Sequence, residues 1–261
     1  MEKKYELTDE TEVHYGCTLH RIVAVRNFGN VKAGDKGGWI EKESNLSQEG
    51  NCWVFDEARV LGGAIVSEDA TVYDNATVCD RAKVYGCARL FGRAKVYRDA
   101  RVYANAQVYA NAEIFHNANV YGDAEVYDNA QIYGYAEVYG NARVHDRACV
   151  CGISLVHDNA SVYGRALVCD HAEVRGDADV RGEATLRGDA VVSSDRDYIV
   201  FKNWWSSGRF FTWTRSNNLW DVGCFHGNGT YLIRKAYADS EESGREYERI
   251  VRYVEEIQKD R

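Results

Sequence analysis

Hydrophobic residues recur at every sixth position of the chain from Val54 to Val192, without an interruption. These positions hold Val54, Val60, Val66, Val72, Val78, Val84, Leu90, Val96, Val102, Val108, Ile114, Val120, Val126, Ile132, Val138, Val144, Val150, Val156, Val162, Val168, Val174, Val180, Leu186 and Val192. Alanine stands two positions before nearly every one of them, with Cys52 and Ser154 as small substitutes. Because alternate residues of a strand share a face, the small and the aliphatic residue point inward, and the mostly polar residue between them points outward.

The repeating unit reads Ala-x-Val-Tyr-Gly-Asn with variations, and its last two positions mostly hold residue types that occupy sharp turns. Three units make one triangular coil of 18 residues, and successive coils stack about 4.8 Å apart. The pattern therefore predicts an all-β solenoid over residues 52–193, a parallel β-helix of about eight 18-residue coils. Its terminal coils expose backbone and apolar core, so we expect a cap at each end.

The two flanking segments do not continue the repeat. Residues 1–51 hold two strand-like stretches, 5–7 and 19–25, followed by glycine-rich turns, and predict a small β N-terminal cap. Residues 194–261 predict an α+β C-terminal domain, a β-meander with strands at 198–205, 209–217 and 219–226. Two helices follow in this prediction, one over 230–237 and one that starts after Gly244.

Apolar residues at the outward positions predict where the caps pack. Trp53 and Ile65 lie in the first coil, next to the N-terminal cap, and Leu155, Leu167 and Val191 lie in the last coils. We therefore expect the C-terminal segment to fold back over the last coils, although single exposed apolar residues are also common on protein surfaces.

Residues 19–57, LHRIVAVRNFGNVKAGDKGGWIEKESNLSQEGNCWVFDE, resemble the N-terminal cap of YdcK-like proteins, and the repeat resembles that of hexapeptide-repeat proteins. The resemblance covers the cap and the repeats and extends more faintly into the tail, which is similar to phage-encoded members. It implies a left-handed β-helix and a phage or prophage origin. Members of this group are often named acyltransferases from their fold alone, so the resemblance implies no established activity.

Charge and cysteine content narrow the function classes. The net charge of −8 argues against direct nucleic-acid binding, which needs a basic face. The charged start MEKKYELTDE lacks the apolar stretch of a signal peptide, and no apolar run is long enough for a membrane span. We therefore expect a cytoplasmic protein, in the host cytoplasm if it is phage-encoded. Eight cysteines without a signal peptide then predict reduced thiols.

Aromatic residues follow the core aliphatic residue in most middle rungs. Residues that lie one coil apart in the sequence stack on each other, so three columns are expected along the rod. They consist of Tyr85, Tyr103, Tyr121 and Tyr139, of Tyr73, Phe91, Tyr109 and Tyr127, and of Tyr97, Phe115 and Tyr133. Two interpretations remain open: the columns form a contact surface, which suits tyrosine, or they only stabilise the solenoid. A column could also serve trimerisation.

One cluster has metal-ligand chemistry. Cys149, Cys151 and Cys169 are expected to share one side of the prism, and His171 follows in the next turn. Thiolate and imidazole could hold zinc there, or the repeat could bring unligated thiols together by chance. No two of the four histidines of the repeat lie one coil apart, so the three-histidine zinc site of β-helical carbonic anhydrases is not expected.

The tail carries an aromatic and basic group, formed by Trp204, Trp205, Arg209 and Trp213. These residues either hold a ligand or form the core of the small domain. The only GxG spacing lies at residues 227–229 and lacks the third glycine and the βαβ context of a dinucleotide site. No cofactor is therefore expected.

Three functions fit these patterns. The leading hypothesis is a non-enzymatic scaffold, phage or prophage encoded, that presents a rigid surface to a protein partner. A sharper form is an inhibitor of a host defence or nucleic-acid enzyme. The alternatives are an acyl-CoA-dependent acyltransferase at a trimer interface and a self-assembling structural protein, and a homo-oligomer, dimer or trimer, is compatible with both. No rung carries an inserted loop, and no histidine has a visible orienting partner, which weighs against an enzyme.

Overall fold

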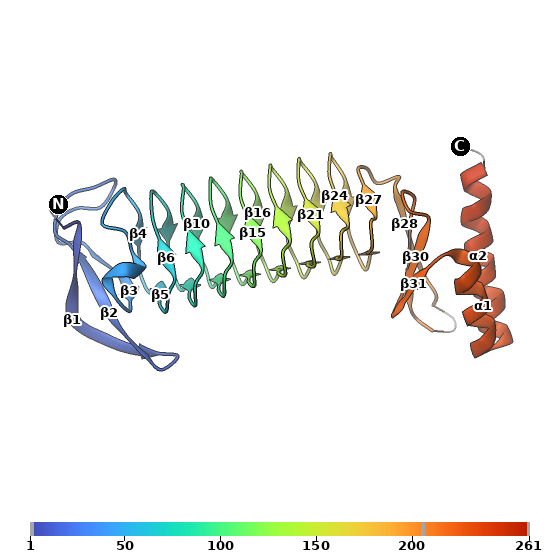
Figure 1. Ribbon diagram of the computed structural model, residues 1–261, viewed down its shortest axis with the longest axis horizontal. Coiled ribbons are helices and arrows are strands. Elements are labelled where there is room, and N and C mark those ends of the chain that lie inside the picture. The colour runs from blue at the N-terminus through green and yellow to red at the C-terminus, as the bar shows by residue number, and fades with distance from the viewer. Residues whose placement is uncertain (1–2, 205–206, 260–261) are drawn as a thin grey trace.

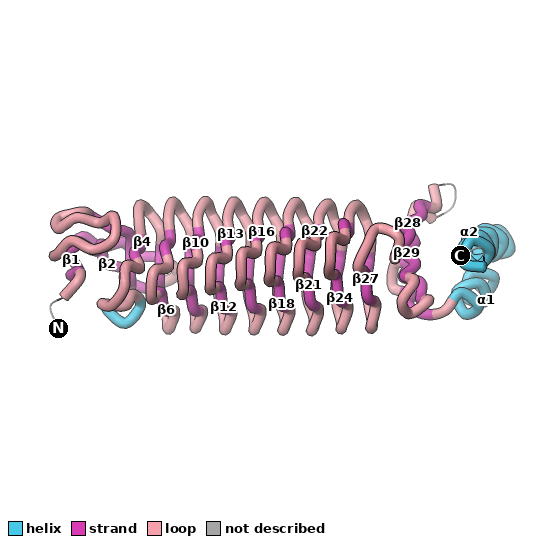
Figure 2. Tube along the Cα trace, turned by 90° about the horizontal axis from the view of Figure 1, so that it is seen from above, coloured by secondary structure: helices cyan, strands magenta, loops and turns pink. Residues whose placement is uncertain are grey.

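A computed structural model describes residues 3–204 and 207–259 as one elongated molecule (Figure 1). A rod of stacked coils runs along the long axis, with an antiparallel sheet at its N-terminal end (Figures 1 and 2). A second small sheet and two helices lie at the other end. The predicted all-β solenoid with a β cap and an α+β tail is confirmed.

The rungs of the rod are short strands. They are β4 (Trp53–Val54), β5 (Arg59–Val60), β6 (Ile65–Val66), β7 (Thr71–Val72), β8 (Thr77–Val78), β9 (Lys83–Val84), β10 (Arg89–Leu90), β11 (Lys95–Val96), β12 (Arg101–Val102), β13 (Gln107–Val108), β14 (Glu113–Ile114), β15 (Asn119–Val120), β16 (Glu125–Val126), β17 (Gln131–Ile132), β18 (Glu137–Val138), β19 (Arg143–Val144), β20 (Cys149–Val150), β21 (Leu155–Val156), β22 (Ser161–Val162), β23 (Leu167–Val168), β24 (Glu173–Val174), β25 (Asp179–Val180), β26 (Thr185–Leu186) and β27 (Val191–Val192). Every third rung pairs in parallel, which makes three sheets around one core.

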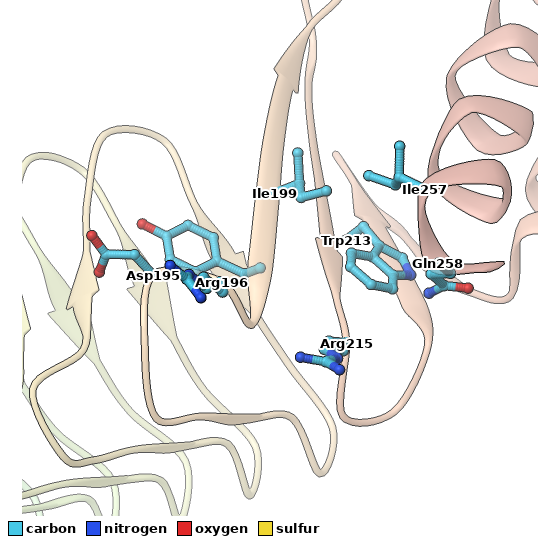
Figure 3. A pocket seen from close by; sticks show the side chains of 8 residues that line it. Asp195, Arg196, Ile199, Trp213, Arg215, Ile257 and Gln258 are labelled. Carbon is cyan, nitrogen blue, oxygen red and sulfur yellow. The ribbon is translucent and has the colours of Figure 1, made fainter. Parts of the chain in front are cut away.

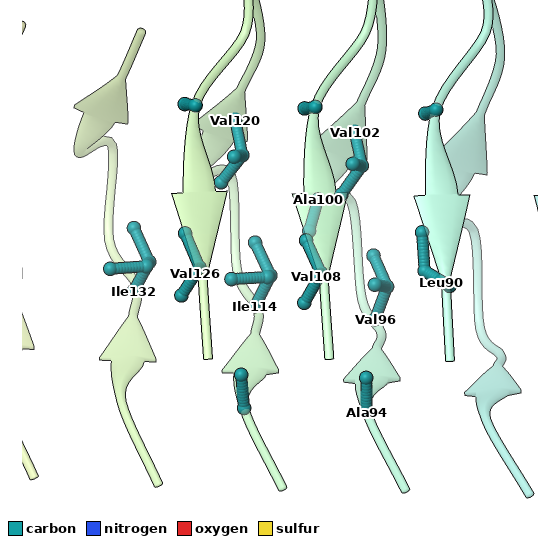
Figure 4. Close-up of a cluster of buried hydrophobic side chains, with 14 of the residues drawn as sticks. Leu90, Ala94, Val96, Ala100, Val102, Val108, Ile114, Val120, Val126 and Ile132 are labelled. Carbon is teal, nitrogen blue, oxygen red and sulfur yellow. The ribbon is translucent and has the colours of Figure 1, made fainter. Parts of the chain in front are cut away.

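The register between coils follows the predicted period of three rungs. Val102 lies opposite Val120, and the backbone N–H of Tyr103 donates to the carbonyl of Val120 at 3.0 Å. The alanine and aliphatic positions are completely or almost completely buried and fill the interior as layers of small and branched side chains (Figure 4). Such alternation packs a narrow prism without large voids, and this core holds the outward side chains in fixed rows.

The corners of the rod require a left-handed backbone conformation once in each rung. Gly122 has a φ of +73°, and a Cβ there would lie 2.8 Å from the backbone nitrogen of Gly140. Aspartate occupies the same position in other rungs, as at Asp158 with a φ of +58°. Its carboxylate accepts a hydrogen bond from the backbone N–H of Gly176 at 3.0 Å, which lowers the pKa of Asp158. Aspartate therefore tolerates the strained corner and also links it to the next coil.

The N-terminal cap is formed by β1 (Tyr5–His14), β2 (Cys17–Ala24) and β3 (Lys36–Ile40), followed by the short 3₁₀ helix η1 (Glu43–Asn45). Strand β3 pairs antiparallel with β2 and parallel with β5 of the rod. Leu46 then forms a parallel bridge to Val66. An irregular coil thus precedes the predicted first rung and lengthens the solenoid by about one turn.

Trp53 anchors this cap on the first coil. Its side chain is 1% exposed, and its ring makes edge contacts with Tyr5 and Phe28 at centroid distances of 6.0 and 5.3 Å. The packing expected from its outward apolar position is therefore found. Ile65 differs, because its residue stays 38% exposed and the cap leaves it uncovered.

The tail contains β28 (Tyr198–Lys202), β29 (Phe210–Thr214), β30 (Leu219–Val222), β31 (Phe225–Gly227), α1 (Gly229–Asp239) and α2 (Glu241–Lys259). The expected strand over 219–226 is two strands, because Gly223 takes a φ of +60° and turns the chain into a hairpin. The second helix begins before Gly244 instead of after it, and Gly244 packs against the ring of Tyr237.

The tail covers the end of the rod and supplies hydrogen-bond acceptors to backbone N–H groups of the last coil, which point away from the rod along its axis. The N–H of Thr185 donates to Oγ1 of Thr212 at 2.9 Å, and the N–H of Val191 donates to Oγ of Ser216 at 2.7 Å. These donors have no further coil to pair with, so the side chains of the tail replace the missing ladder. These contacts fall on residues 179–191, and the fold-back over Leu155 and Leu167 that the sequence predicts is not found among the described hydrogen bonds.

Within the described residues, neither helix has the length and hydrophobicity that a membrane crossing requires.

Candidate functional site

The tyrosine column consists of Tyr85, Tyr103, Tyr121 and Tyr139, and the structure stacks all four rings on one face of the rod. Successive ring centroids are 4.9, 4.8 and 4.9 Å apart, and the ring planes deviate by 3–5°. His157 extends the stack at 4.8 Å from Tyr139. Each ring is half-buried because its faces cover one another, so the column presents ring edges and hydroxyl groups outward.

Hydrogen bonding and burial keep this column neutral. The hydroxyl of Tyr121 donates to Oε2 of Glu137 at 2.9 Å. Burial raises the pKa of Tyr103, and burial together with that hydrogen bond raises the pKa of Tyr121 above the ordinary tyrosine range. The column therefore offers phenol groups as hydrogen-bond donors over apolar ring edges. Such a surface resembles the aromatic contact area of many protein interfaces.

A second column runs along another face. It contains Phe91, Tyr109, Tyr127, His145 and Tyr163, with centroid distances between 4.7 and 4.9 Å. The third column, Tyr97, Phe115 and Tyr133, stacks at 4.9 Å. The spacing of one coil thus predicts the stacking of most of these rings. Tyr73 is the exception: among the described ring contacts it stacks on Phe55, at 4.7 Å, and not on Phe91.

The third column ends at the predicted thiol cluster. Cys151 and Cys169 are 8% and 9% exposed, and Cys149 is half-buried. Hydrogen bonds from the thiols of Cys149 and Cys169 lower the pKa of Cys151, and the same contacts raise the pKa of the other two thiols. His171 is exposed at a corner of the rod.

The zinc site expected from Cys149, Cys151, Cys169 and His171 does not form a compact ligand set. Among the described residues, no three of these four place their ligand atoms within 4.8 Å of one another. Asp128, His145 and Asp146 do, at a corner of the second column. The sequence carries a signal for this group, since Asp128 and Asp146 lie one coil apart. The thiol cluster remains a prediction of metal binding without geometric support.

The aromatic and basic group of the tail is divided between two environments. Trp213 is 3% exposed in the core of the tail, and its Nε1 donates to Oδ1 of Asn218 at 2.9 Å. Trp204 is 76% exposed, and Arg209 lies on the surface near Cys224. Trp205 lies outside the described residues. Of the two interpretations, Trp213 supports the structural one.

A histidine–aspartate pair in the tail was not predicted. Asp221 of β30 is buried, and Nδ1 of His226 of β31 lies 3.0 Å from its Oδ1. Burial raises the pKa of Asp221, while His226 and Arg187 oppose that rise. A histidine oriented by a buried carboxylate is an arrangement used in general-base catalysis. The glycine at 223 was the available signal, because a hairpin there makes 221 and 226 cross-strand neighbours.

Comparison with known proteins gives one similarity over part of the chain. No family model matches the sequence. A stretch of 74 residues is 39% identical to a protein of Escherichia coli (strain K12) named "Uncharacterized acetyltransferase YdcK". The repeat, the solenoid and this match together fit a hexapeptide-repeat protein.

The match is too short to transfer the activity of the relative to this chain. It covers 25% of this chain and 23% of the E. coli protein, so the chain matches less than a quarter of the length of that relative. The activity in the relative's name is therefore a hypothesis for this chain.

Proposed function

We propose that the chain is a non-enzymatic binding scaffold that presents the tyrosine column to a protein partner. The observation that carries the proposal is the continuous stack from Tyr85 to His157 on one face of the rod. Five coils at the usual strand spacing give a strip of roughly 20 Å. A rigid strip of half-buried aromatic edges loses little conformational entropy on binding, which favours its use as an interface.

Charge along the same face supports a protein partner with complementary charge. Lys83 and Arg101 occupy the outward positions next to Tyr85 and Tyr103, and Glu137 and Glu173 occupy those nearer the tail. The face is therefore basic toward the N-terminal cap and acidic toward the tail. Such a gradient orients a partner of opposite polarity along the rod.

The sharper form of this proposal is an inhibitor of a host defence or nucleic-acid enzyme, encoded by a phage or prophage. The acidic net charge of −8 supports it, because an acidic rod competes for a basic surface. The proposed location for this form is the host cytoplasm.

Removing two rings from the tyrosine column tests the scaffold. In the double variant Tyr103→Ala with Tyr121→Ala, we expect the affinity for the partner to fall by about tenfold or more, since central aromatic residues dominate interfaces. Partner recovered from host lysate on the immobilised chain is quantified for wild type and variant, with the thermal midpoint measured in parallel.

The second column provides a matched control. Tyr109→Ala with Tyr127→Ala removes the same number of stacking contacts, each contributing about 0.5–1.5 kcal/mol to stability, from a different face. Both double variants are expected to lose similar stability, and only the first is expected to lose the partner. Equal recovery by both variants would mean that the columns are structural supports alone.

Acyl transfer is a second candidate, favoured by the name of the E. coli relative. Within the rod, His157 is held by carboxylates at both ring nitrogens, 3.1 Å from Glu173 and 3.2 Å from Asp158. His226 is the better base, because Asp221 holds its Nδ1 and the described contacts give its Nε2 no hydrogen-bond partner. This candidate would place the reaction at the junction of the rod and the tail.

Titration with acetyl-CoA distinguishes the two candidates. The scaffold proposal predicts no saturable heat of binding at millimolar acetyl-CoA in isothermal titration calorimetry. Saturable binding, together with acetyl transfer that the variant His226→Ala loses by about a hundredfold or more, would establish the enzyme instead. His171→Ala, an exposed histidine at a nearby corner, is the control variant.

A further inference from the structure

A cavity of about 450 Å³ lies where the last turn of the rod, the tail sheet and the end of α2 meet (Figure 3). Ile199 of β28 and Trp213 of β29 are cross-strand partners, and Ile257 of α2 faces them across the space. These three side chains form an apolar wall. The volume falls in the range of pockets that hold small organic molecules, about 300–1,000 Å³.

Two arginines line the same cavity. Arg196 comes from the turn after the last rung, and Arg215 follows the end of β29. In the part of the chain that the structure describes, neither guanidinium has an ion-pair or hydrogen-bond partner. Both residues are exposed, so their side chains are available to a ligand in the cavity.

Asp195 also lines the cavity, so its charged residues are two arginines and one aspartate, and the lining keeps a net positive charge. Oδ1 of Asp195 accepts a hydrogen bond from the backbone N–H of Asp179 at 3.0 Å, which caps the rod. Oδ2 of Asp197 accepts hydrogen bonds from the backbone and hydroxyl groups of Ser193 and Ser194 at 2.8–3.2 Å. Both carboxylates therefore stabilise the turn that follows the last rung. Arginine in an open, partly apolar site is suited to carboxylate and other oxyanions.

We propose that this cavity binds a small amphipathic carboxylate. Arg196 and Arg215 hold the carboxylate, and Ile199, Trp213 and Ile257 cover the apolar body. Tyr198 fixes one side of the cavity, because its hydroxyl donates to the carbonyl of Asp179 at 2.7 Å and so joins β28 to the rod. This site is independent of the tyrosine column and requires neither candidate function.

Three ligands distinguish the contribution of the carboxylate charge to binding from the contribution of the apolar body. Octanoate carries both features, acetate carries only the charge, and octanol carries only the apolar body. Isothermal titration calorimetry on the full chain is expected to show saturable binding of one octanoate per chain. Acetate and octanol are expected to bind about tenfold more weakly or worse, because each lacks one of the two contributions.

The double variant Arg196→Gln with Arg215→Gln tests the location. Loss of two charge-assisted hydrogen bonds is expected to weaken octanoate binding by about tenfold or more. Neither side chain has a partner to lose among the described residues, so the thermal midpoint is expected to stay unchanged. The control is Arg249→Gln in a second apolar cavity of the tail, lined by Phe201 and Tyr253, where Arg249 is paired with Glu246 at 2.9 Å.

Three results would overturn the proposal. They are octanoate binding that does not saturate, equal binding of octanol, and weakened binding in Arg249→Gln with normal binding in the double variant. The last result would move the site to the second cavity.

Discussion

Replacing Val126 with aspartate is expected to unfold the rod. Val126 is fully buried in the shared core of the three sheets, among Val108 and other aliphatic side chains (Figure 4). An unpaired buried carboxylate costs about 3–5 kcal/mol or more, which is a large part of the stability of a typical domain of about 5–15 kcal/mol. We expect loss of the cooperative melting transition in circular dichroism, or a large fall in its midpoint.

Glu125→Asp is the matched control for this change. Residue 125 is adjacent to Val126 on the same rung but points outward and is only half-buried, so an aspartate there still reaches water. Its melting transition is expected to match that of wild type. A stable Val126→Asp protein would contradict the packed interior, since it would require space or water beside the carboxylate.

Replacing Trp53 with alanine is expected to have the second largest effect on stability. The ring is 1% exposed and packs against Tyr5 and Phe28, which belong to the N-terminal cap. Truncation of a buried tryptophan costs about 3–5 kcal/mol. Because a solenoid is stabilised mainly between neighbours, the loss is expected to fall on the cap and the first coils. Limited proteolysis should then cleave within residues 3–51 while the middle of the rod stays protected.

Ile65→Ala is the control for Trp53→Ala. Ile65 occupies the same outward position in the first coil but is 38% exposed. Its truncation removes much less buried area and is expected to lower the free energy of unfolding by about 1 kcal/mol or less. Equal destabilisation by both variants would contradict the role of Trp53 as the anchor of the cap.

The rod could be predicted from the sequence because every rung repeats one environment. Val120 lies between Val102 and Val138 of the adjacent coils, and most other core residues have equivalent neighbours. The additional coil at the N-terminal end was missed because this regularity fails there. Trp39 pairs with Arg59 and Leu46 with Val66, and neither separation is a whole number of rungs.

The functional surfaces could be predicted only where they follow the period. The stacking of Tyr103 on Tyr121 follows from their spacing of one coil. The pair of Asp221 and His226 depends on a hairpin that composition alone does not distinguish from one longer strand. The junction cavity joins Arg196, Arg215 and Ile257, which are brought together by the packing of α2 on the tail sheet and the seating of that sheet on the rod. No local sequence pattern predicts such packing.

Native mass spectrometry of the tagged chain, gently purified from host lysate, tests the central claim most directly. It measures the mass of the oligomer, of any bound protein and of any bound small molecule in one spectrum. The scaffold proposal predicts a stoichiometric complex with a protein partner that dissociates when Tyr103 and Tyr121 are replaced by alanine. A bare trimer with a bound mass the size of coenzyme A would contradict it and favour acyl transfer, and filaments without any partner would favour self-assembly.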